Sequence, residues 1–106
     1  MSKIFEHGAE VLPVDAKAIR AKWAAEGFSF GIFRDPPNQE WNDFVHDTDE
    51  YVLVAEGTLT IGVGDQISET GPGDLVRIPK HMAHSLKTTS SEGSVWFYGY
   101  GHWSGT

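Results

Sequence analysis

The chain is organised around FVHDTDEYVLVAEG, the stretch from Phe44 to Gly57. Its second half is apolar at nearly every position and ends in a Glu-Gly pair, which is typical of a strand that runs into a tight turn. His46 and Glu50 bring an imidazole and a carboxylate to this otherwise apolar segment. Their even spacing places both side chains on one side of the strand if the polar bend at 47–49 preserves the alternation. The stretch is therefore both the centre of the predicted fold and the beginning of a candidate site.

We expect the strands at 51–55 and 58–63 to form a hairpin around this Glu-Gly turn. A two-residue loop sets Val54 opposite Leu59 and turns Glu50 toward the large apolar side chains of the second strand. Tyr51 makes the opposite side of the first strand apolar as well. A strand that is apolar on both sides is usually covered on both. We expect the helix predicted below or a second subunit to supply the outer cover.

The rest of the chain predicts one helix followed by short strands. Asp15 can cap a helix over 16–26, and Gly27 is suited to end it. From Phe28 onward the apolar period is two residues, with turn signals every eight to twelve residues, which is typical of a β-sandwich or barrel. We expect an all-β domain in which residues 1–27 form an arm and a helix and residues 28–106 form the barrel. The further strands are expected at 28–32, 40–46, 66–70, 75–78, 84–88 and 94–100.

Length and charge exclude several functional classes. The 106 residues carry 15 acidic and 8 basic side chains, a formal net charge of −7, and no cysteine. A basic face for nucleic acid or for an anionic membrane surface is therefore not expected. No signal peptide fits residues 1–14, and no apolar run approaches the ~18 residues of a membrane helix. We expect a cytoplasmic protein, without disulfides or thiolate metal sites.

A second chemistry-bearing stretch, GDLVRIPKHMAH, extends from Gly73 to His84. An ionised Glu50 in an apolar interior costs several kcal/mol unless a metal, a cation or protonation compensates it. His46, Glu50 and His84 together supply two imidazoles and one carboxylate. This is the facial ligand set of non-haem iron, and zinc, nickel or manganese also accept it. The residues alone therefore offer a candidate divalent metal site, with protonation of Glu50 or another cation as the alternatives.

The two stretches resemble the paired motifs of the cupin superfamily. The first motif, H-x-H-x3–4-E-x6-G, corresponds to Phe44, His46, Glu50 and Gly57, and the second, G-x5-P-x-G-x2-H-x3-N, to Gly73, Pro79, His81, His84 and Thr88. The resemblance implies a double-stranded β-helix, or jelly-roll barrel, with a metal held inside by His46, Glu50 and His84. It does not specify a reaction, because cupins include dioxygenases, isomerases, decarboxylases and proteins without enzymatic activity.

Three positions depart from these motifs. Phe44 replaces a histidine ligand, which lowers the expected metal affinity and gives the site an apolar wall. His81 replaces the turn glycine, either as a solvated residue that tolerates positive φ or as an acid–base group at the barrel mouth. Thr88 replaces the final asparagine and is expected to alter only a turn or an outer hydrogen bond. His7 and His102 are further histidines that could complete the ligand set.

Aromatic residues suggest where a small molecule would bind. Trp96, Tyr98 and Tyr100 share one face of the last strand and could line a pocket together with Phe30 and Trp41, although an aromatic stripe also fits a plain core. Tyr98 combines a ring with a polar tip that can reach a ligand. The candidate pocket comprises Phe30, Trp41, Phe44, His81 and Tyr98.

We therefore predict a small cupin, expected as a homodimer, that holds a divalent cation (Fe, Zn, Ni or Mn) in a pocket for a small-molecule ligand. It could act as a metal-dependent enzyme of the dioxygenase or isomerase type. The alternative is a metal-free module for a sugar or organic acid, or an acid–base epimerase in which Glu50 is protonated and bonded to a histidine. The sequence assigns no catalytic residue and leaves enzyme and binding module open.

Overall fold

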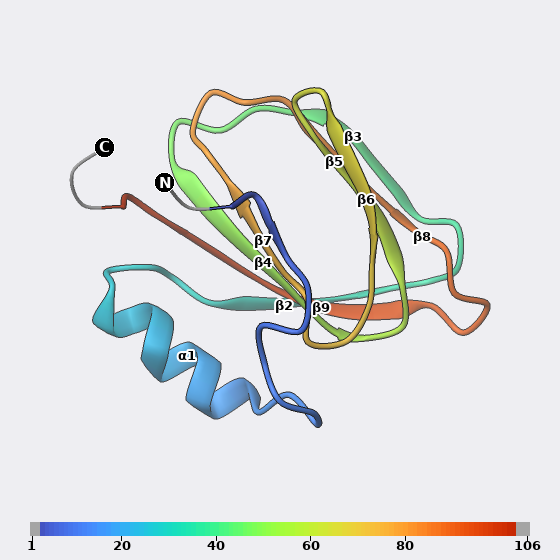
Figure 1. Ribbon diagram of the computed structural model, residues 1–106, viewed down its shortest axis with the longest axis horizontal. Coiled ribbons are helices and arrows are strands. Elements are labelled where there is room, and N and C mark those ends of the chain that lie inside the picture. Colours follow the sequence, from blue (N-terminus) through green and yellow to red (C-terminus); the bar gives the residue numbers. More distant parts are fainter. Residues whose placement is uncertain (1–2, 104–106) are drawn as a thin grey trace.

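The computed structural model describes residues 3–103, in which nine strands and one helix form two facing sheets with the helix outside them (Figure 1). All the strand pairings are antiparallel. The elements, in chain order, are β1 (Phe5–Glu6), α1 (Ala16–Ala25), β2 (Gly31–Asp35), β3 (Glu40–Phe44), β4 (Asp49–Glu56), β5 (Leu59–Val63), β6 (Gln66–Thr70), β7 (Leu75–Ile78), β8 (His84–Thr88) and β9 (Ser94–Gly101). No helix within residues 3–103 is long and apolar enough to cross a membrane.

The two sheets enclose the main core. One sheet has the strand order β1-β7-β4-β9-β2 and the other the order β3-β8-β5-β6. Inward-facing side chains of both sheets meet between them, because successive residues of a strand point to opposite faces. The buried members of this core are Val52, Val54, Leu59, Ile61, Val63, Val76, Ile78, Leu86 and Trp96. The predicted all-β jelly-roll class with one short helix is confirmed.

The predicted hairpin between β4 and β5 is wrong. β4 pairs with β7 and β9, whereas β5 pairs with β6 and β8 in the other sheet. The Glu56-Gly57 turn is therefore a corner at which the chain passes from one sheet to the other. Gly57 has a φ of 78°, and a Cβ atom there would lie 2.3 Å from the Gly93 carbonyl oxygen, so this corner requires glycine. Two strands joined by a hairpin and two strands joined by such a corner show the same alternation of apolar residues. The sequence pattern therefore cannot distinguish the two connections, which explains the error.

Helix α1 covers the outer face of the five-stranded sheet, as one of the two predicted covers. The Asp15 carboxylate accepts hydrogen bonds from the N–H groups of Lys17 and Ala18 and caps the helix. Gly27, at a φ of 82°, ends it, as the sequence predicts. The buried helix side chains join those of three strands and the Phe28 ring in a second cluster: Ile19, Trp23, Phe28, Tyr51, Leu53, Leu75 and Phe97.

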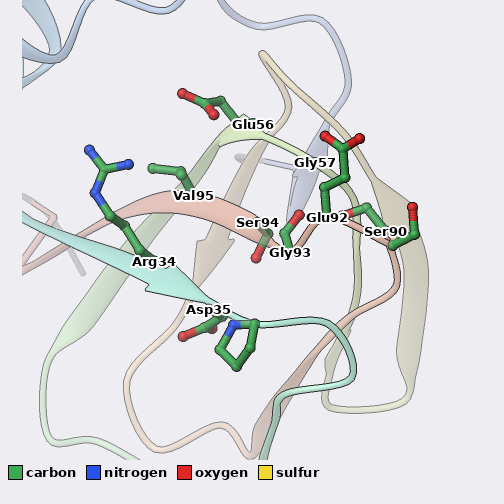
Figure 2. A pocket seen from close by; sticks show the side chains of 11 residues that line it. Arg34, Asp35, Glu56, Gly57, Ser90, Glu92, Gly93, Ser94 and Val95 are labelled. Carbon is green, nitrogen blue, oxygen red and sulfur yellow. Dashed lines mark hydrogen bonds between the residues drawn. The ribbon is translucent and has the colours of Figure 1, made fainter.

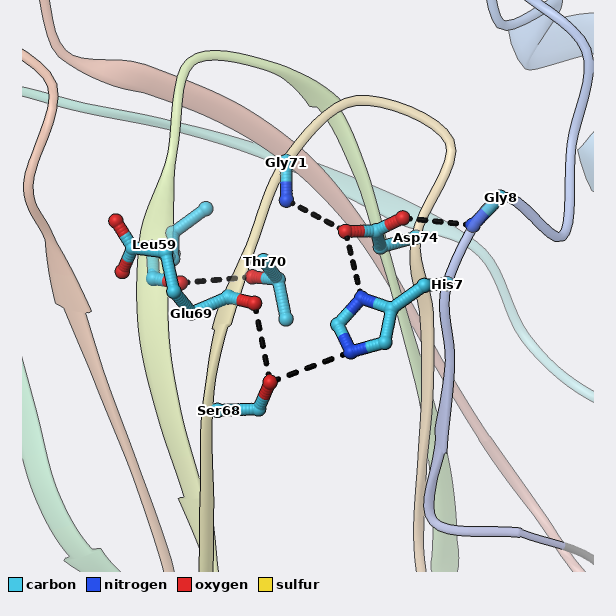
Figure 3. Close-up of polar contacts among 8 residues, drawn as sticks. All are labelled: His7, Gly8, Leu59, Ser68, Glu69, Thr70, Gly71 and Asp74. Carbon is cyan, nitrogen blue, oxygen red and sulfur yellow. Dashed lines mark hydrogen bonds and ion pairs between the residues drawn. The ribbon is translucent and has the colours of Figure 1, made fainter.

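The N-terminal arm closes the open side between the two sheets (Figure 3). β1 lies at the edge of one sheet and β6 at the edge of the other. Just after β1, His7 Nδ1 lies 3.1 Å from Asp74 Oδ2 and its Nε2 lies 3.3 Å from Ser68 Oγ on β6. Asp74 also accepts hydrogen bonds from the N–H groups of Gly8 and Gly71, each 2.8 Å long. We call this group of five residues the seam cluster.

The seam cluster changes the acidity of Asp74. Burial by itself pushes the pKa of the Asp74 carboxyl upward, but the N–H groups of Gly71 and Gly8 and the His7 ring outweigh burial and lower this pKa below its ordinary value. The folded protein therefore favours the ionised carboxylate at this position. His7, which the sequence offers as a possible extra ligand, is instead part of this closure.

Candidate metal centre

Three elements bring the candidate ligands together. Glu50 is the second residue of β4 and faces inward with Val52 and Val54. His84 opens β8, where it is the pairing partner of Val63 and thus faces inward as well. His46 lies between β3 and β4. Ligands from separate parts of the chain therefore meet at one end of the barrel interior.

The ligand atoms of the three residues converge. Nε2 of His84 lies 3.3 Å from Glu50 Oε1, and Nε2 of His46 lies 3.6 Å from the same oxygen. One ligand atom from each residue lies within 4.8 Å of the other two. The side chains of Glu50 and His84 are 5% and 3% exposed, and that of His46 is 31% exposed. The cluster is thus buried on one side and accessible on the other.

Hydrogen bonding around this cluster fits a cation. His84 Nδ1 lies 3.3 Å from the Met82 carbonyl oxygen, which can only accept, so Nδ1 carries a proton. In the neutral ring, Nε2 then presents a lone pair to the Glu50 carboxylate. Glu50 Oε1 is buried and has no hydrogen-bond partner. Acceptor atoms that face one another without a donor are the arrangement that a bound cation satisfies.

Asp49, next to Glu50, fixes the surroundings of the cluster. It is buried, and its two carboxylate oxygens accept hydrogen bonds from the N–H groups of Lys80 and Trp103, both 2.9 Å long. These bonds tie the turn before β8 and the segment after β9 to the start of β4. Sequence reasoning assigned Asp49 only to a bend. The sequence carries no signal for this role, because the partners of Asp49 are the distant residues Lys80 and Trp103.

Phe44 stands where the resemblance places another histidine. It is the pairing partner of His84 across β3 and β8. Its ring centroid lies 6.2 Å from those of both His46 and His84, and the residue is 37% exposed. Phe44 therefore forms an apolar wall beside the two imidazoles and offers no ligand atom.

The aromatic lining differs from the prediction at one position. Trp41 and Tyr98 pack against the main core, as expected for inward-facing residues. Phe30 does not; it packs on Trp23 and Phe97 under the helix, so its predicted place in the pocket is wrong. Phe33 lies on the inward-facing side of β2 instead, with its ring centroid 4.8 Å from that of Tyr98, although it is 36% exposed.

The pairing of β2 explains this exchange. Gly31 is opposite Tyr98 and Phe33 is opposite Trp96, so the odd-numbered residues of β2 face inward. Both the even-numbered and the odd-numbered residues of 28–35 include apolar side chains. The sequence alone therefore does not decide which set faces the core. Asp35, on the same inward face, accepts hydrogen bonds from the indole N–H groups of Trp41 and Trp96, both 2.9 Å long. This anchor was missed by sequence reasoning.

His81 lies at the surface beside the cluster. Its φ is 67°, as expected for a residue in the place of a turn glycine, and its N–H donates to the His46 carbonyl oxygen over 2.8 Å. Its side chain is 67% exposed and lies 3.7 Å from the Asp47 carboxylate. His102, the other histidine considered as a reinforcement, is exposed. The backbone of His81 positions His46, whereas its ring faces solvent and Asp47.

The comparisons with known proteins agree with this fold. The family model of the cupin domain matches residues 31–100. The chain belongs to the cupin family. No protein with a curated description matches this cupin.

Solved structures share the fold of this cupin at low sequence identity. The protein TT1209 from Thermus thermophilus has a TM-score of 0.64 and 18% identity, over 71% of this chain and 73% of that one. An RmlC-like cupin from Shewanella frigidimarina has a TM-score of 0.63 and 18% identity, over 69% and 64%. A mutant of Bacillus subtilis oxalate decarboxylase OxdC has a TM-score of 0.66 and 20% identity, over 78% of this chain but 23% of the decarboxylase. These likenesses concern the fold alone.

Tyr100 adds a hydroxyl group beside the ligands of this cupin. Burial raises the pKa of Tyr100 to about 12, and the charges of Glu50 and Tyr98 act in the same direction. Its ring meets the His46 ring edge-on at a centroid distance of 5.1 Å. At neutral pH Tyr100 is therefore a protonated phenol that can donate a hydrogen bond.

Among the hollows formed by the described residues, two border the barrel of this cupin. One, of about 240 Å³, is lined by His84 together with Asp43, Gly62 and Gly64 among others, but by neither His46 nor Glu50, so it does not open onto the whole candidate centre. The other, of about 690 Å³, lies at the Glu56 end of β4, away from Glu50 (Figure 2). No histidine lines this larger hollow, so it is separate from the candidate metal centre.

Proposed function

We propose that this cupin binds a divalent transition metal through His46, Glu50 and His84, in a partly aromatic pocket that accepts a small molecule. The observation that supports the proposal most directly is the buried Glu50 Oε1, which lacks a hydrogen-bond partner and faces two imidazole nitrogens. Two imidazoles and one carboxylate suit iron, zinc, nickel or manganese. A metal bound there supplies Lewis-acid or oxygen-activating chemistry.

The residues of the chain have distinct tasks in this proposal. The Glu50 carboxylate offsets positive charge, and the Met82 carbonyl holds the His84 ring so that Nε2 faces the centre. Phe44 keeps one side apolar, and Tyr100 offers a hydroxyl donor. The pocket can serve either an enzyme of the dioxygenase or isomerase type or a module that recognises its ligand without turnover.

The metal-free alternative rests on Phe44. Replacement of one histidine ligand by an aromatic ring weakens any metal site, and a protonated Glu50 could bond to His46 or His84 at slightly shorter distances than the present 3.6 and 3.3 Å. In that case the pair would bind a sugar or organic acid, or perform acid–base work as in an epimerase.

Metal content distinguishes the two functions. The protein is purified without a histidine tag, and its Fe, Zn, Ni and Mn are measured by mass spectrometry. We expect close to one metal per chain in the parent, loss of the metal in His84→Ala, and retention in His102→Ala, a matched control because that histidine is exposed. A parent protein that stays free of metal after incubation with each ion, yet binds a small molecule, contradicts the proposal and favours the alternative.

We further propose that the protein is cytoplasmic and acts as a homodimer, with a small molecule rather than nucleic acid as its partner. The net charge of −7 supports the last point. Light scattering coupled to size-exclusion chromatography would give the mass; a monomer at micromolar concentration contradicts the dimer.

A further inference from the structure

Aromatic rings form a continuous wall beside the candidate metal centre. Phe33, Trp41, Phe44, Tyr98 and Tyr100 are linked by ring contacts with centroid distances between 4.8 and 5.9 Å. At one end Tyr100 meets the His46 ring, and Phe44 reaches the rings of both candidate histidine ligands. We call these five residues the aromatic wall.

The aromatic wall is accessible from solvent. Phe33 is 36% and Phe44 37% exposed, and Tyr98 and Tyr100 are only partly buried. Joined apolar surface of this kind is uncommon on a soluble domain unless something binds there, and ligand pockets combine such surface with a few polar groups. Here the polar groups are the phenolic hydroxyls and the three candidate ligands.

Charge restricts what can bind at this place. A divalent ion with the Glu50 carboxylate carries a net charge of +1. Two basic side chains, Lys22 and Arg77, form ion pairs with Glu10 and Glu6 away from the candidate centre. The exposed carboxylate of Asp47, which lies beside the centre, adds negative charge. A singly charged ligand gives a neutral complex, whereas a dianion leaves an uncompensated negative charge in a partly buried site, which is costly.

We infer that the pocket takes an aromatic ring with two adjacent hydroxyl groups, of the catechol class, bound as a monoanion. This inference rests on the proposed metal function. The two adjacent oxygens suit a centre whose three protein ligands leave positions open, and the ring stacks against the aromatic wall. One O–H bond of the ligand breaks on binding and its proton is released to solvent, while every other bond of the ligand is unchanged.

The class of ligand can be tested with 4-nitrocatechol, whose absorbance changes when it chelates a metal. The full chain is loaded with Zn²⁺, its zinc content is measured, and the probe is titrated with and without competitors. We expect saturable binding that requires Glu50 and His84, and no displacement by a tenfold excess of oxalate or inorganic phosphate. Displacement by oxalate or phosphate at up to a tenfold excess overturns the inference, and so does an absorbance change of equal size in His84→Ala.

The aromatic wall is tested by Tyr98→Leu, which keeps an apolar side chain of moderate size. We expect this variant to keep its zinc and to bind 4-nitrocatechol about fivefold more weakly. Ile67→Ala, at an exposed position on β6, is the matched control and keeps the parent affinity. Unchanged affinity in Tyr98→Leu overturns the inference and leaves the metal function standing, whereas a parent chain that holds no zinc contradicts the metal function itself.

Discussion

At the residue scale, Phe44 decides how many ligand atoms the centre can offer. Its ring lies beside both candidate histidine ligands, at 6.2 Å from each, and it occupies the motif position of a further histidine. We predict that Phe44→His adds a ligand and tightens Zn²⁺ binding by about tenfold or more, which is about 1.4 kcal/mol. Competition with a chromophoric chelator measures the affinity. Phe44→Leu is the control, and equal affinities of the two variants contradict the prediction.

Tyr51 ties the barrel to the helix through a single hydroxyl group. Burial, followed by the hydrogen bond of 2.6 Å that its hydroxyl donates to Glu26, raises the pKa of Tyr51 above its ordinary value of 10.0. Because the folded-state pKa is raised, this stabilisation is fully present below about pH 10 and is lost as the pH rises beyond it.

We predict that Tyr51→Phe lowers the free energy of unfolding at pH 7 by about 1–2 kcal/mol, because the hydrogen bond to Glu26 is lost. Above pH 10 the stability of the variant should fall less steeply than that of the parent. Urea unfolding from pH 7 to 11 measures both effects. Parallel curves above pH 10 would show that the Tyr51 hydroxyl does not carry this pH dependence.

At the scale of elements, the seam cluster holds β1 and β6 together through one carboxylate. Asp74 accepts from two backbone N–H groups and lies 3.1 Å from the His7 ring. We predict that Asp74→Ala lowers the free energy of unfolding by about 1–3 kcal/mol at neutral pH, since the two N–H groups lose their acceptor. Hydrogen exchange should accelerate at Gly8 and Gly71.

The same carboxylate gives a pH dependence of opposite direction to that of Tyr51. The folded-state pKa of Asp74 is lowered, so its contribution is present above about pH 4 and is lost as the pH falls through the folded-state value. The stabilities of Asp74→Ala and the parent should therefore approach one another in acid. Asp65→Ala, in an exposed turn, is the control, and a constant difference at all pH values would contradict the assignment.

The elements also show where sequence reasoning succeeds. Most strand and helix positions were predictable because they follow from local period and from capping residues such as Asp15 and Gly27, but β2 spans Gly31–Asp35 and not the predicted 28–32. The partners of β4 were not, because the contacts that choose them come from β7 and β9, distant in the sequence. Phe30 was misplaced for a related reason, since only the register with β9 selects the inward residues of β2.

At the scale of the whole molecule, a bound ion should stabilise the fold by mass action. The candidate ligands join segments on both sides of the barrel, and the unfolded chain does not hold them together. At a free metal concentration a hundredfold above its dissociation constant the gain is about 2.7 kcal/mol. We predict a rise in Tm of roughly 10 °C for a domain of this size. Circular dichroism with and without Zn²⁺ measures it, and a rise of equal size in His84→Ala contradicts the site.

For the site as a whole, the paired motifs predicted the convergence of His46, Glu50 and His84, because both stretches carry their own spacing and turn signals. The residues that hold these side chains in place were not predictable. Asp35 accepts from indoles on β3 and β9, and Asp49 accepts from backbone N–H groups in the turn before β8 and in the segment after β9, so the burial of both depends on distant parts of the chain. The candidate ligands can thus be recognised from local sequence motifs, whereas the residues that hold them in place depend on tertiary contacts.

The double-sided burial of β4 has a consequence for observing the molecule at work. Glu50 and Tyr51 are neighbours that point to opposite faces, and the Tyr51 ring stacks on Trp23 of the helix at a centroid distance of 5.2 Å. Any displacement of the strand when an ion arrives inside the barrel is passed directly to an indole on its outside. The fluorescence emission of Trp23 should therefore change when an ion binds inside the barrel, although Trp23 does not contact the ion. Trp23→Phe should remove this part of the fluorescence change.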